Sequence, residues 1–593
     1  MHEIRGVAVV KPWKLAFEKP PRRFRPIMQL PANHLQFESE IAPDRRDPNR
    51  SADRALGRVI GCSGSRATIA ANATGQGAAD GCAIGRLISI SLGKSRVVGL
   101  VYEMRALEPI WKETGTNAVA VEVELLGEVV DGQNGTARFD SGITSYPPIG
   151  ALAHRIRSRD LELIHDLGER KSVVLGTLTQ DASVAASIDV ERLLSRHFAV
   201  LGTTGVGKSS AVALMLRKAI EAKPNLRILI LDPHNEYAHA FPDNSARIDA
   251  STLDLPFWLF RFEEFADIVF RGRPPLEDEA EILREVIAVA RSRYRTVSPQ
   301  DMARDLGTSL LKRPLDLGGA RRTAEAGGAA ELAAPYRLVD LFTAIDELIG
   351  LHELRYPRTT LRALRVRLET LHGDPRYGFL FAHANSMETI APVISQIFRV
   401  PHRGRPVTVF QLAGLPSEVV NAVASSLARL SFDLAMASRG SYEILLLCEE
   451  AHRYVPQDQA LGFAPTRQAI ARIAKEGRKY GAYLGIVTQR PGELDPTILS
   501  QCSTVFAMRL GNERDQQIIR AAIADASAST IAFLSSIGNR EAIAFGEAVA
   551  TTMRMRFLEQ RPEELPAMAG RMPGQVEPRE PLVEELVARM RGL

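Results

Sequence analysis

FAVLGTTGVGKSS, residues 198–210, carries an apolar strand into a glycine-rich turn and then into a helix-forming segment. It satisfies G-x-x-x-x-G-K-[ST], in which glycines let backbone N–H groups surround phosphate oxygens. The helix that follows adds its positive N-terminal end. Lys208 can reach the β- and γ-phosphates, and the Ser209 hydroxyl can ligate Mg²⁺. We therefore predict binding of ATP and Mg²⁺. The predicted nucleotide-binding residues are Gly202, Thr203, Thr204, Gly205, Val206, Gly207, Lys208, Ser209 and Ser210.

A second apolar strand delivers two carboxylates in EILLLCEEAH, residues 443–452. In an open parallel α/β sheet, the ligand chemistry gathers at the carboxyl ends of the strands. One acid can assist Mg²⁺ while the next polarises the attacking water. We assign Glu449 to the metal and Glu450 to the water, although the residues alone allow these roles to be reversed.

Two more apolar runs end in polar residues that suit the same site. DPHNEY, residues 232–237, supplies Asp232 and Glu236, which we expect near the γ-phosphate, where they could order water or metal. TQRP, residues 488–491, supplies Gln489 as a γ-phosphate sensor. A glutamine at a strand end is usually structural, so this last assignment depends on the other motifs.

A basic cluster lies in ARIAKEGRKYG, residues 471–481, and consists of Arg472, Lys475, Arg478 and Lys479. An arginine there could reach a neighbouring subunit's ATP, and such fingers are worth about 10³–10⁵ in rate. Cations also gather at helix C-termini for dipole reasons. On physical grounds alone, the two interpretations have equal weight.

The composition is compatible with many functions of a soluble protein. The 593 residues are 45% apolar and 24% charged, with a formal net charge of +4, as in ordinary soluble proteins. Any nucleic-acid surface must therefore be a local patch. The four cysteines form no CxxC pair, which fits a reducing cytoplasm. No uncharged apolar run approaches the ~18–20 residues that span a bilayer, so we expect no membrane insertion.

The pattern along the chain predicts an α/β protein with an N-terminal small β-barrel and an inserted helical subdomain. Short strands broken by glycine suggest the barrel, and strands alternating with helices suggest the nucleotide-binding core. The predicted boundaries are a Pro/Arg-rich arm over 1–54, the barrel over 55–185, the core over 186–262 and 391–560, the helical subdomain over 263–390, and a C-terminal link and helix over 561–593.

GTTGVGKSS, DPHNEY, CEEAH, ARIAKEGRKYG and TQRP, in this order, resemble the HerA family of the FtsK–HerA group of P-loop motor ATPases. The resemblance covers about 55–560 and implies a RecA-like core. It also implies a homo-hexamer that encircles double-stranded DNA and translocates it with ATP. Members of the family often act with a NurA-like nuclease in DNA end processing. Some bacterial members pair with sirtuin-type or nuclease effectors in phage defence.

Carried over residue by residue, the resemblance favours Glu450 as the catalytic acid and Arg478 as the finger, with Arg472 second. It also places Asp232 near the γ-phosphate. Two departures from the family pattern concern this site. Asn235 stands where glycine is usual, although asparagine tolerates the left-handed backbone that the turn needs. The loop from Gln411 lacks the usual carboxylate, which weakens any role for it in binding metal.

Two other functions remain open. The barrel, arm and C-terminal helix are not needed for hydrolysis, so the chain could be a scaffold whose ATPase gates an effector enzyme. A peripheral conjugation or secretion ATPase would share the motor fold without a membrane segment.

Overall fold

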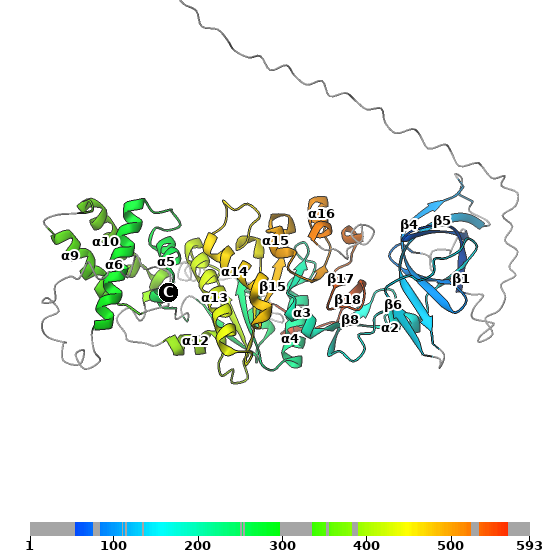
Figure 1. Cartoon of the computed structure of the whole chain (residues 1–593), viewed down its shortest axis with the longest axis horizontal. Helices are drawn as coiled ribbons and strands as arrows, with labels where there is room; N and C mark the ends of the chain where they lie inside the picture. Colours follow the sequence, from blue (N-terminus) through cyan, green and yellow to red (C-terminus); the bar gives the residue numbers. More distant parts are fainter. Residues whose placement is uncertain are drawn as a thin grey trace, which may run out of the picture. The chain divides into compact units, whose positions relative to one another are not determined.

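The computed structural model describes residues 54–74, 83–108, 111–112, 116–132, 136–249, 252, 255–296, 335–351, 355–381, 390–522 and 533–566 (Figure 1). The predicted C-terminal helix and nearly all of the predicted N-terminal arm lie outside these residues. Part of the predicted helical subdomain, 297–334, lies outside them too.

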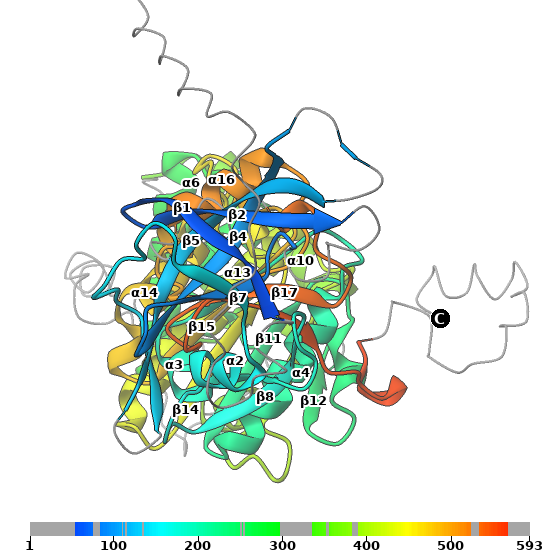
Figure 2. The same cartoon turned by 90° about the vertical axis from the view of Figure 1, so that its right-hand side faces the viewer.

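The first strands form the small barrel that the sequence predicts (Figure 2). They are β1 (Ala55–Ser63), β2 (Arg66–Thr74), β3 (Leu87–Ser91), β4 (Ser95–Ala106), β5 (Thr116–Asp131), β6 (Ala137–Asp140) and β7 (Leu152–Arg155). Six strands run in the order β2-β1-β7-β3-β4-β5, and pairing of β2 with β5 closes the ring. Small and β-branched side chains such as Ile69, Val97 and Val121 fill the interior.

The predicted barrel boundary at residue 185 is wrong. The run KSVVLGTL forms β8 (Ser172–Leu178), and β8 pairs with β9 (Ala185–Asp189) and β18 (Met553–Phe557) in the core sheet. The barrel strands end at Arg155, and the short helix α2 (Ser158–Ile164) follows. A strand pattern does not name its partner, and this partner is nearly 400 residues away along the chain.

The core sheet has eleven strands. Their order is β12 (Ser245–Ile248), β13 (Val407–Gln411), β11 (Leu226–Asp232), β14 (Glu443–Cys448), β15 (Ala482–Thr488), β10 (Phe198–Leu201), β16 (Thr504–Ala507), β17 (Glu541–Gly546), β18, β8 and β9. The strands from β12 to β16 are parallel. From β17 onward the pairing is antiparallel. The central parallel strands β11 and β15 are buried along their whole length, as expected where helices cover both faces of a sheet.

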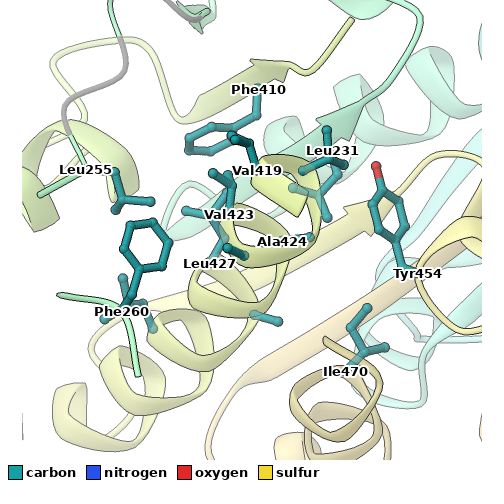
Figure 3. Packing of buried hydrophobic residues seen from close by; sticks show 14 of the residues in the cluster. Leu231, Leu255, Phe260, Phe410, Val419, Val423, Ala424, Leu427, Tyr454 and Ile470 are labelled. Atoms are coloured by element: carbon teal, nitrogen blue, oxygen red, sulfur yellow. The ribbon is translucent and has the colours of Figure 1, made fainter. Parts of the chain in front are cut away.

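Alternate residues of the central strands enter two separate cores. Leu229 and Leu231 of β11 pack beneath α13 (Ser417–Ser438) and α14 (Ala464–Glu476), where Figure 3 shows Val423 and Leu427. Ile228 and Ile230 face the other way, into the core that contains α4 (Lys208–Ala222). The remaining helices of the ATPase core are α3 (Val190–Ser195), α15 (Pro496–Leu499) and α16 (Glu513–Ala522). This three-layer arrangement confirms the predicted RecA-like core.

The predicted helical subdomain occupies the chain between β12 and β13. Among the described residues, its helices are α5 (Phe262–Val269), α6 (Glu277–Thr296), α9 (Leu338–Gly350), α10 (Arg358–Gly373), α11 (Gly378–Phe381) and α12 (Ile390–Phe398). Helices α6, α9 and α10 pack on one another, and α5 packs on α13 (Figure 1).

Helix α13 is the one described helix that is long and apolar enough to cross a membrane. Of its most apolar window, 78% is buried inside the protein, as expected for the central helix of a core.

Candidate nucleotide site

The loop between β10 and α4 has the shape that its glycines predict. Gly205 and Gly207 adopt φ angles of 78° and 100°, which a residue with a side chain rarely adopts. Gly202 is required for a steric reason, because an added Cβ would lie 2.8 Å from the Cβ of Met508. Both constraints keep the backbone curled at the start of α4, where free N–H groups can bind phosphate.

Lys208 begins α4 and turns back over the loop. Its ammonium donates a hydrogen bond to the carbonyl oxygen of Thr203 at 3.1 Å, and the residue is only 7% exposed. Burial lowers the pKa of this ammonium, and the carboxylates of Glu449, Glu450 and Glu236 oppose that change. The lysine therefore lies close to three of the four predicted acids.

The strand order explains how the acids face this loop. β15 lies between β10, which leads into the loop, and β14, which ends in the two glutamates. Neighbouring strands are about 4.8 Å apart, so β14 runs about 10 Å from β10. That separation leaves room for a terminal phosphate and a water molecule between the phosphate loop and the two glutamates. The end of β15 lies between β10 and β14.

Glu449 is fully buried and bound by a residue from another motif. The Tyr237 hydroxyl donates to its Oε2 at 2.6 Å. Burial raises the pKa of Glu449 to about 8, with the neighbouring Glu450 adding to the rise and Lys208 opposing it. Tyr237 stood in DPHNEY without an assigned role, and its hydroxyl joins two motifs that are far apart in the sequence.

Glu450 has a different environment. Its backbone is left-handed, with a φ of 50°, and the residue is 6% exposed. Its buried Oε2 accepts no hydrogen bond from the described residues. The closest cationic candidate is the imidazole of His452, with Nδ1 3.4 Å away. A buried carboxylate oxygen without a donor suits a group that binds water or substrate.

Asp232 and Glu236 have separate contacts. The Asp232 carboxylate accepts backbone N–H bonds from Tyr237 at 2.9 Å and His234 at 3.3 Å, so it holds its own loop. Burial raises its pKa, and these N–H donors oppose the rise. It is Glu236 that meets the phosphate loop, where Oε2 accepts from the Ser209 hydroxyl at 3.0 Å.

The two departures in the sequence lie beside this loop. Asn235 adopts a φ of 59°, so the left-handed turn survives without glycine, as predicted. Its side-chain oxygen accepts from the Ala413 N–H at 3.4 Å. Gln411 pairs with Asp232 across β13 and β11, and brings an amide rather than a carboxylate to the sheet edge.

Gln489 contacts the phosphate loop directly, through a short hydrogen bond that its Oε1 accepts from the Thr204 hydroxyl. The residue before it, Thr488, shares a hydrogen bond with His452 Nδ1 at 3.0 Å. The end of β15 therefore touches the loop on one side and the neighbour of Glu450 on the other. The histidine of CEEAH gave the only sequence signal for this contact.

Arg478 lies at the opposite edge of the sheet. It is near His197, which precedes β10, whereas the phosphate loop follows β10. Burial lowers the pKa of His197 to about 4, and the cation of Arg478 adds to the lowering. Arg478 is exposed, and no described carboxylate pairs with it. Arg472 instead stacks 4.0 Å above the ring of Phe432 and pairs with Asp433 at 3.7 Å.

The residues present fit a nucleotide with Mg²⁺. Ser209, Glu236 and Glu449 offer oxygen ligands beside Lys208, and the free oxygen of Glu450 faces the same group. Mg²⁺ usually takes one or two carboxylates and completes its shell with substrate phosphates and water. Such a donor set holds the metal only together with the nucleotide.

Comparison with known proteins gives a consistent result. The family model "Helicase HerA, central domain" matches residues 173–431. The DNA double-strand break repair helicase HerA of Pyrococcus furiosus is 26% identical over 74% of this chain and 81% of its own length. The HerA helicase of Sulfolobus acidocaldarius is 25% identical over 68% and 72%.

Two solved structures resemble this fold more distantly. VirB4 of Thermoanaerobacter pseudethanolicus matches with a TM-score of 0.44 and 16% identity, over 67% of this chain and 98% of that one. The plasmid coupling protein TrwB, in complex with a non-hydrolysable ATP analogue, matches with a TM-score of 0.42 and 13% identity, over 72% and 96%.

Proposed function

This chain belongs to the HerA family of P-loop ATPases, and we propose that it works as a homo-hexamer that translocates double-stranded DNA. The chain is an ATPase of the helicase type. The hexamer, the effector partner and the cellular process belong to the proposal.

The position of Arg478 carries the hexamer proposal. A four-residue strand is about 13 Å long, and Arg478 lies beyond the far end of β10 from the phosphate loop. Its side chain cannot span that length to reach the γ-phosphate of its own subunit. An exposed arginine without a carboxylate partner suits a site on a neighbouring subunit, as in ring-shaped ATPases with trans fingers.

The chemistry follows from the contacts around the loop. Lys208 and the amino end of α4 bind the phosphates, which frees Lys208 from Thr203. Ser209, with Glu449 nearby, would hold Mg²⁺ that arrives with ATP, and the metal would neutralise charge on the phosphates. The Ser209 hydroxyl would then no longer be bound to Glu236. Glu450 orients the attacking water.

Gln489 fits the role of a sensor in this scheme. It contacts Thr204 in the loop, and through Thr488 it adjoins His452 beside Glu450. Occupation of the γ-phosphate position would disturb the first contact and shift the second. The catalytic acid would then respond to the presence of ATP.

The partner and the setting remain predictions from the family resemblance. A nuclease of the NurA type or a sirtuin-type effector would act on DNA ends or in phage defence, in the cytoplasm. Affinity purification of the chain with its genomic neighbours tests this point. Failure to form any stable complex would contradict it.

ATPase rates with and without linear double-stranded DNA, measured alongside the particle mass, test the motor. We expect a hexamer whose rate rises with DNA, and in which Glu450→Gln lowers the rate about 10²–10⁴-fold while nucleotide binding is kept. Stimulation should fall as salt rises, because DNA contacts release counterions. A hexamer whose hydrolysis ignores DNA would contradict the motor and favour the scaffold.

Mixing of inactive variants tests the trans arginine. The Lys208→Ala variant lacks a working nucleotide site but keeps Arg478. The Arg478→Ala variant lacks the proposed finger but keeps its own nucleotide site. Each should be inactive alone, and the mixture should recover part of the rate, because one subunit supplies what the other lacks. Arg472→Ala is the matched control, since its side chain is bound within its own subunit. No recovery would contradict a finger at Arg478.

A further inference from the structure

An arginine that no sequence motif marked forms the rim of the phosphate loop. Arg540 precedes β17, and its backbone N–H donates to the carbonyl oxygen of Val206 at 3.0 Å. Its own carbonyl oxygen accepts from the Phe557 N–H at 3.0 Å. The residue has a φ of 59°, in the left-handed region that favours glycine. Two hydrogen bonds thus fix the backbone in a conformation that is unfavourable for a residue with a side chain.

The Arg540 side chain begins directly over the loop. A Cβ added to Gly207 would lie 3.4 Å from Cγ of Arg540 and 3.8 Å from Cε of Met508. Gly207 immediately precedes Lys208, so the arginine stem lies beside the start of α4. The Arg540 side chain is 58% exposed and therefore accessible to a ligand.

The strand order indicates which end of the nucleotide Arg540 faces. Glu449, Glu450 and Gln489 follow β14 and β15, on one side of β10. Arg540 precedes β17, on the other side of β10, at the edge where β16 ends. A nucleotide with its γ-phosphate toward the acids therefore extends its α-phosphate and nucleoside toward Arg540.

The present partner of Arg540 is weakly held. Nη1 is 3.2 Å from Oε1 of Glu559, whose side chain is 83% exposed. Exposed ion pairs of this kind contribute little to stability. The nearer acid in sequence, Glu541, is engaged by Arg554 and Arg556. Arg540 can therefore exchange Glu559 for a phosphate, to which a guanidinium binds with good geometry.

Glu559 belongs to a segment that is tied to the loop's own helix. The Gln560 side chain donates to the Ser210 carbonyl oxygen at 2.9 Å. Arg217 of α4 donates to the carbonyl oxygens of Ala240 and Glu564, each at 2.9 Å. The carboxylate that competes for Arg540 is thus kept beside the nucleotide site.

We propose that Arg540 binds the α-phosphate and nucleoside end of ATP and ADP, and that Glu559 competes with the nucleotide for it. This inference rests on the proposed nucleotide site, and it assigns a contact that none of the sequence motifs includes. Nucleotide binding would then break the link between the loop and the segment that starts at Glu559.

Calorimetric titration of the full-length protein with Mg-ADP tests this without hydrolysis. Arg540→Gly and Arg540→Asn both tolerate the left-handed backbone and both lack the guanidinium. We expect each to weaken Mg-ADP binding about tenfold, the size of a charge-assisted hydrogen bond. Binding of a non-hydrolysable ATP analogue should weaken by the same factor, because the proposed contact is at the α-phosphate end, which both nucleotides share.

Glu559→Gln supplies the opposite change. Removing the competitor should tighten Mg-ADP binding by up to about fivefold, the most an exposed pair contributes. The same substitution in Arg540→Gly should have no effect. Arg561→Ala is the control, because this exposed arginine on the same segment pairs with Glu563 and Glu564.

The outcomes separate this inference from the function on which it rests. Wild-type affinity in both Arg540 variants, with normal thermal unfolding, would overturn the inference and leave the nucleotide site intact. If the Arg540 variants lost affinity for the ATP analogue but not for Mg-ADP, the proposed contact with the α-phosphate would be overturned. If the wild-type protein binds neither ligand, the proposed function fails and the inference fails with it.

Discussion

Two buried glutamates, one beside α13 and one at the end of β14, have opposite surroundings. Glu264 of α5 is 1% exposed, and Glu450 is 6% exposed. Glu264 accepts hydrogen bonds from the hydroxyls of Ser425 and Ser426 at 2.6 and 2.9 Å. It also accepts the Arg261 N–H at 2.8 Å and lies 3.3 Å from the Arg429 guanidinium.

Glu450 is left with an unbonded oxygen in the same degree of burial. Leaving a buried carboxylate oxygen without a donor costs free energy, and folding alone supplies no reason to keep one. The difference teaches that burial does not identify a functional acid. The unused oxygen of Glu450 matters because the residue also lies near Lys208 of the phosphate loop. A missing donor alone is not sufficient, since Asp160 and Asp267 each have a buried oxygen without one as well.

The largest expected effect is on the satisfied acid. Glu264→Ala leaves Arg429 buried without its carboxylate and removes the acceptor of two serine hydroxyls. We expect a loss of about 3–5 kcal/mol in the free energy of unfolding, as for other broken buried ion pairs. Denaturant titration followed by circular dichroism measures it.

Glu450→Ala is the matched control, because it removes a buried carboxylate whose Oε2 accepts no hydrogen bond from the described residues. We expect its unfolding free energy to change by less than about 1 kcal/mol. Equal losses in the two variants would contradict the distinction between the acids.

A smaller effect, dependent on pH, is expected one turn along α5. Burial raises the pKa of Asp267 to about 6, with the charge of Glu418 adding to the rise. The folded protein therefore binds a proton that the unfolded chain releases between pH 4 and 6, so the contribution of Asp267 to stability falls as pH rises through that window. Asp267→Asn should raise the Tm by about 1–2 °C at pH 7.5 and by clearly less at pH 4.5, near the lower end of that window.

Scanning calorimetry at the two pH values measures this change. Asp267 and Glu264 lie on the same helix but have different hydrogen-bond donors, so comparing their variants isolates the effect of those donors. A gain in Tm of the same size at pH 4.5 would show that the effect is not electrostatic.

The meeting of the candidate-site motifs at one sheet edge was predictable because each motif follows an apolar strand. Parallel strands bring their carboxyl ends to one edge, so motifs at Asp232, Glu450 and Gln489 had to meet near Lys208. Periodicity also separated the barrel, the core and the helical region. These features depend on local pattern and on a general property of parallel sheets.

Other features depend on partners that no local pattern names. β8 has an ordinary strand sequence, and only its pairing with β18 removes it from the barrel. Arg540 stands in a loop with no glycine motif, and its importance comes from a contact with Val206, more than 300 residues away. The side-chain donors of Glu264 (Ser425, Ser426 and Arg429) lie on α13, so these contacts could not be predicted from the sequence of α5.

The smallest effect expected concerns Asn235, which the sequence itself marked. Its φ of 59° costs alanine about 1 kcal/mol, whereas glycine adopts it freely. Asn235→Ala should therefore destabilise the protein by about 1 kcal/mol. Asn235→Gly should change the free energy of unfolding by less than about 0.5 kcal/mol. Glycine relieves the backbone strain, and this gain offsets the lost hydrogen bond to Ala413 and the greater conformational freedom of the unfolded chain. Denaturant titration of both variants checks this, and equal losses would mean that the side-chain bond, not the backbone, makes asparagine suitable here.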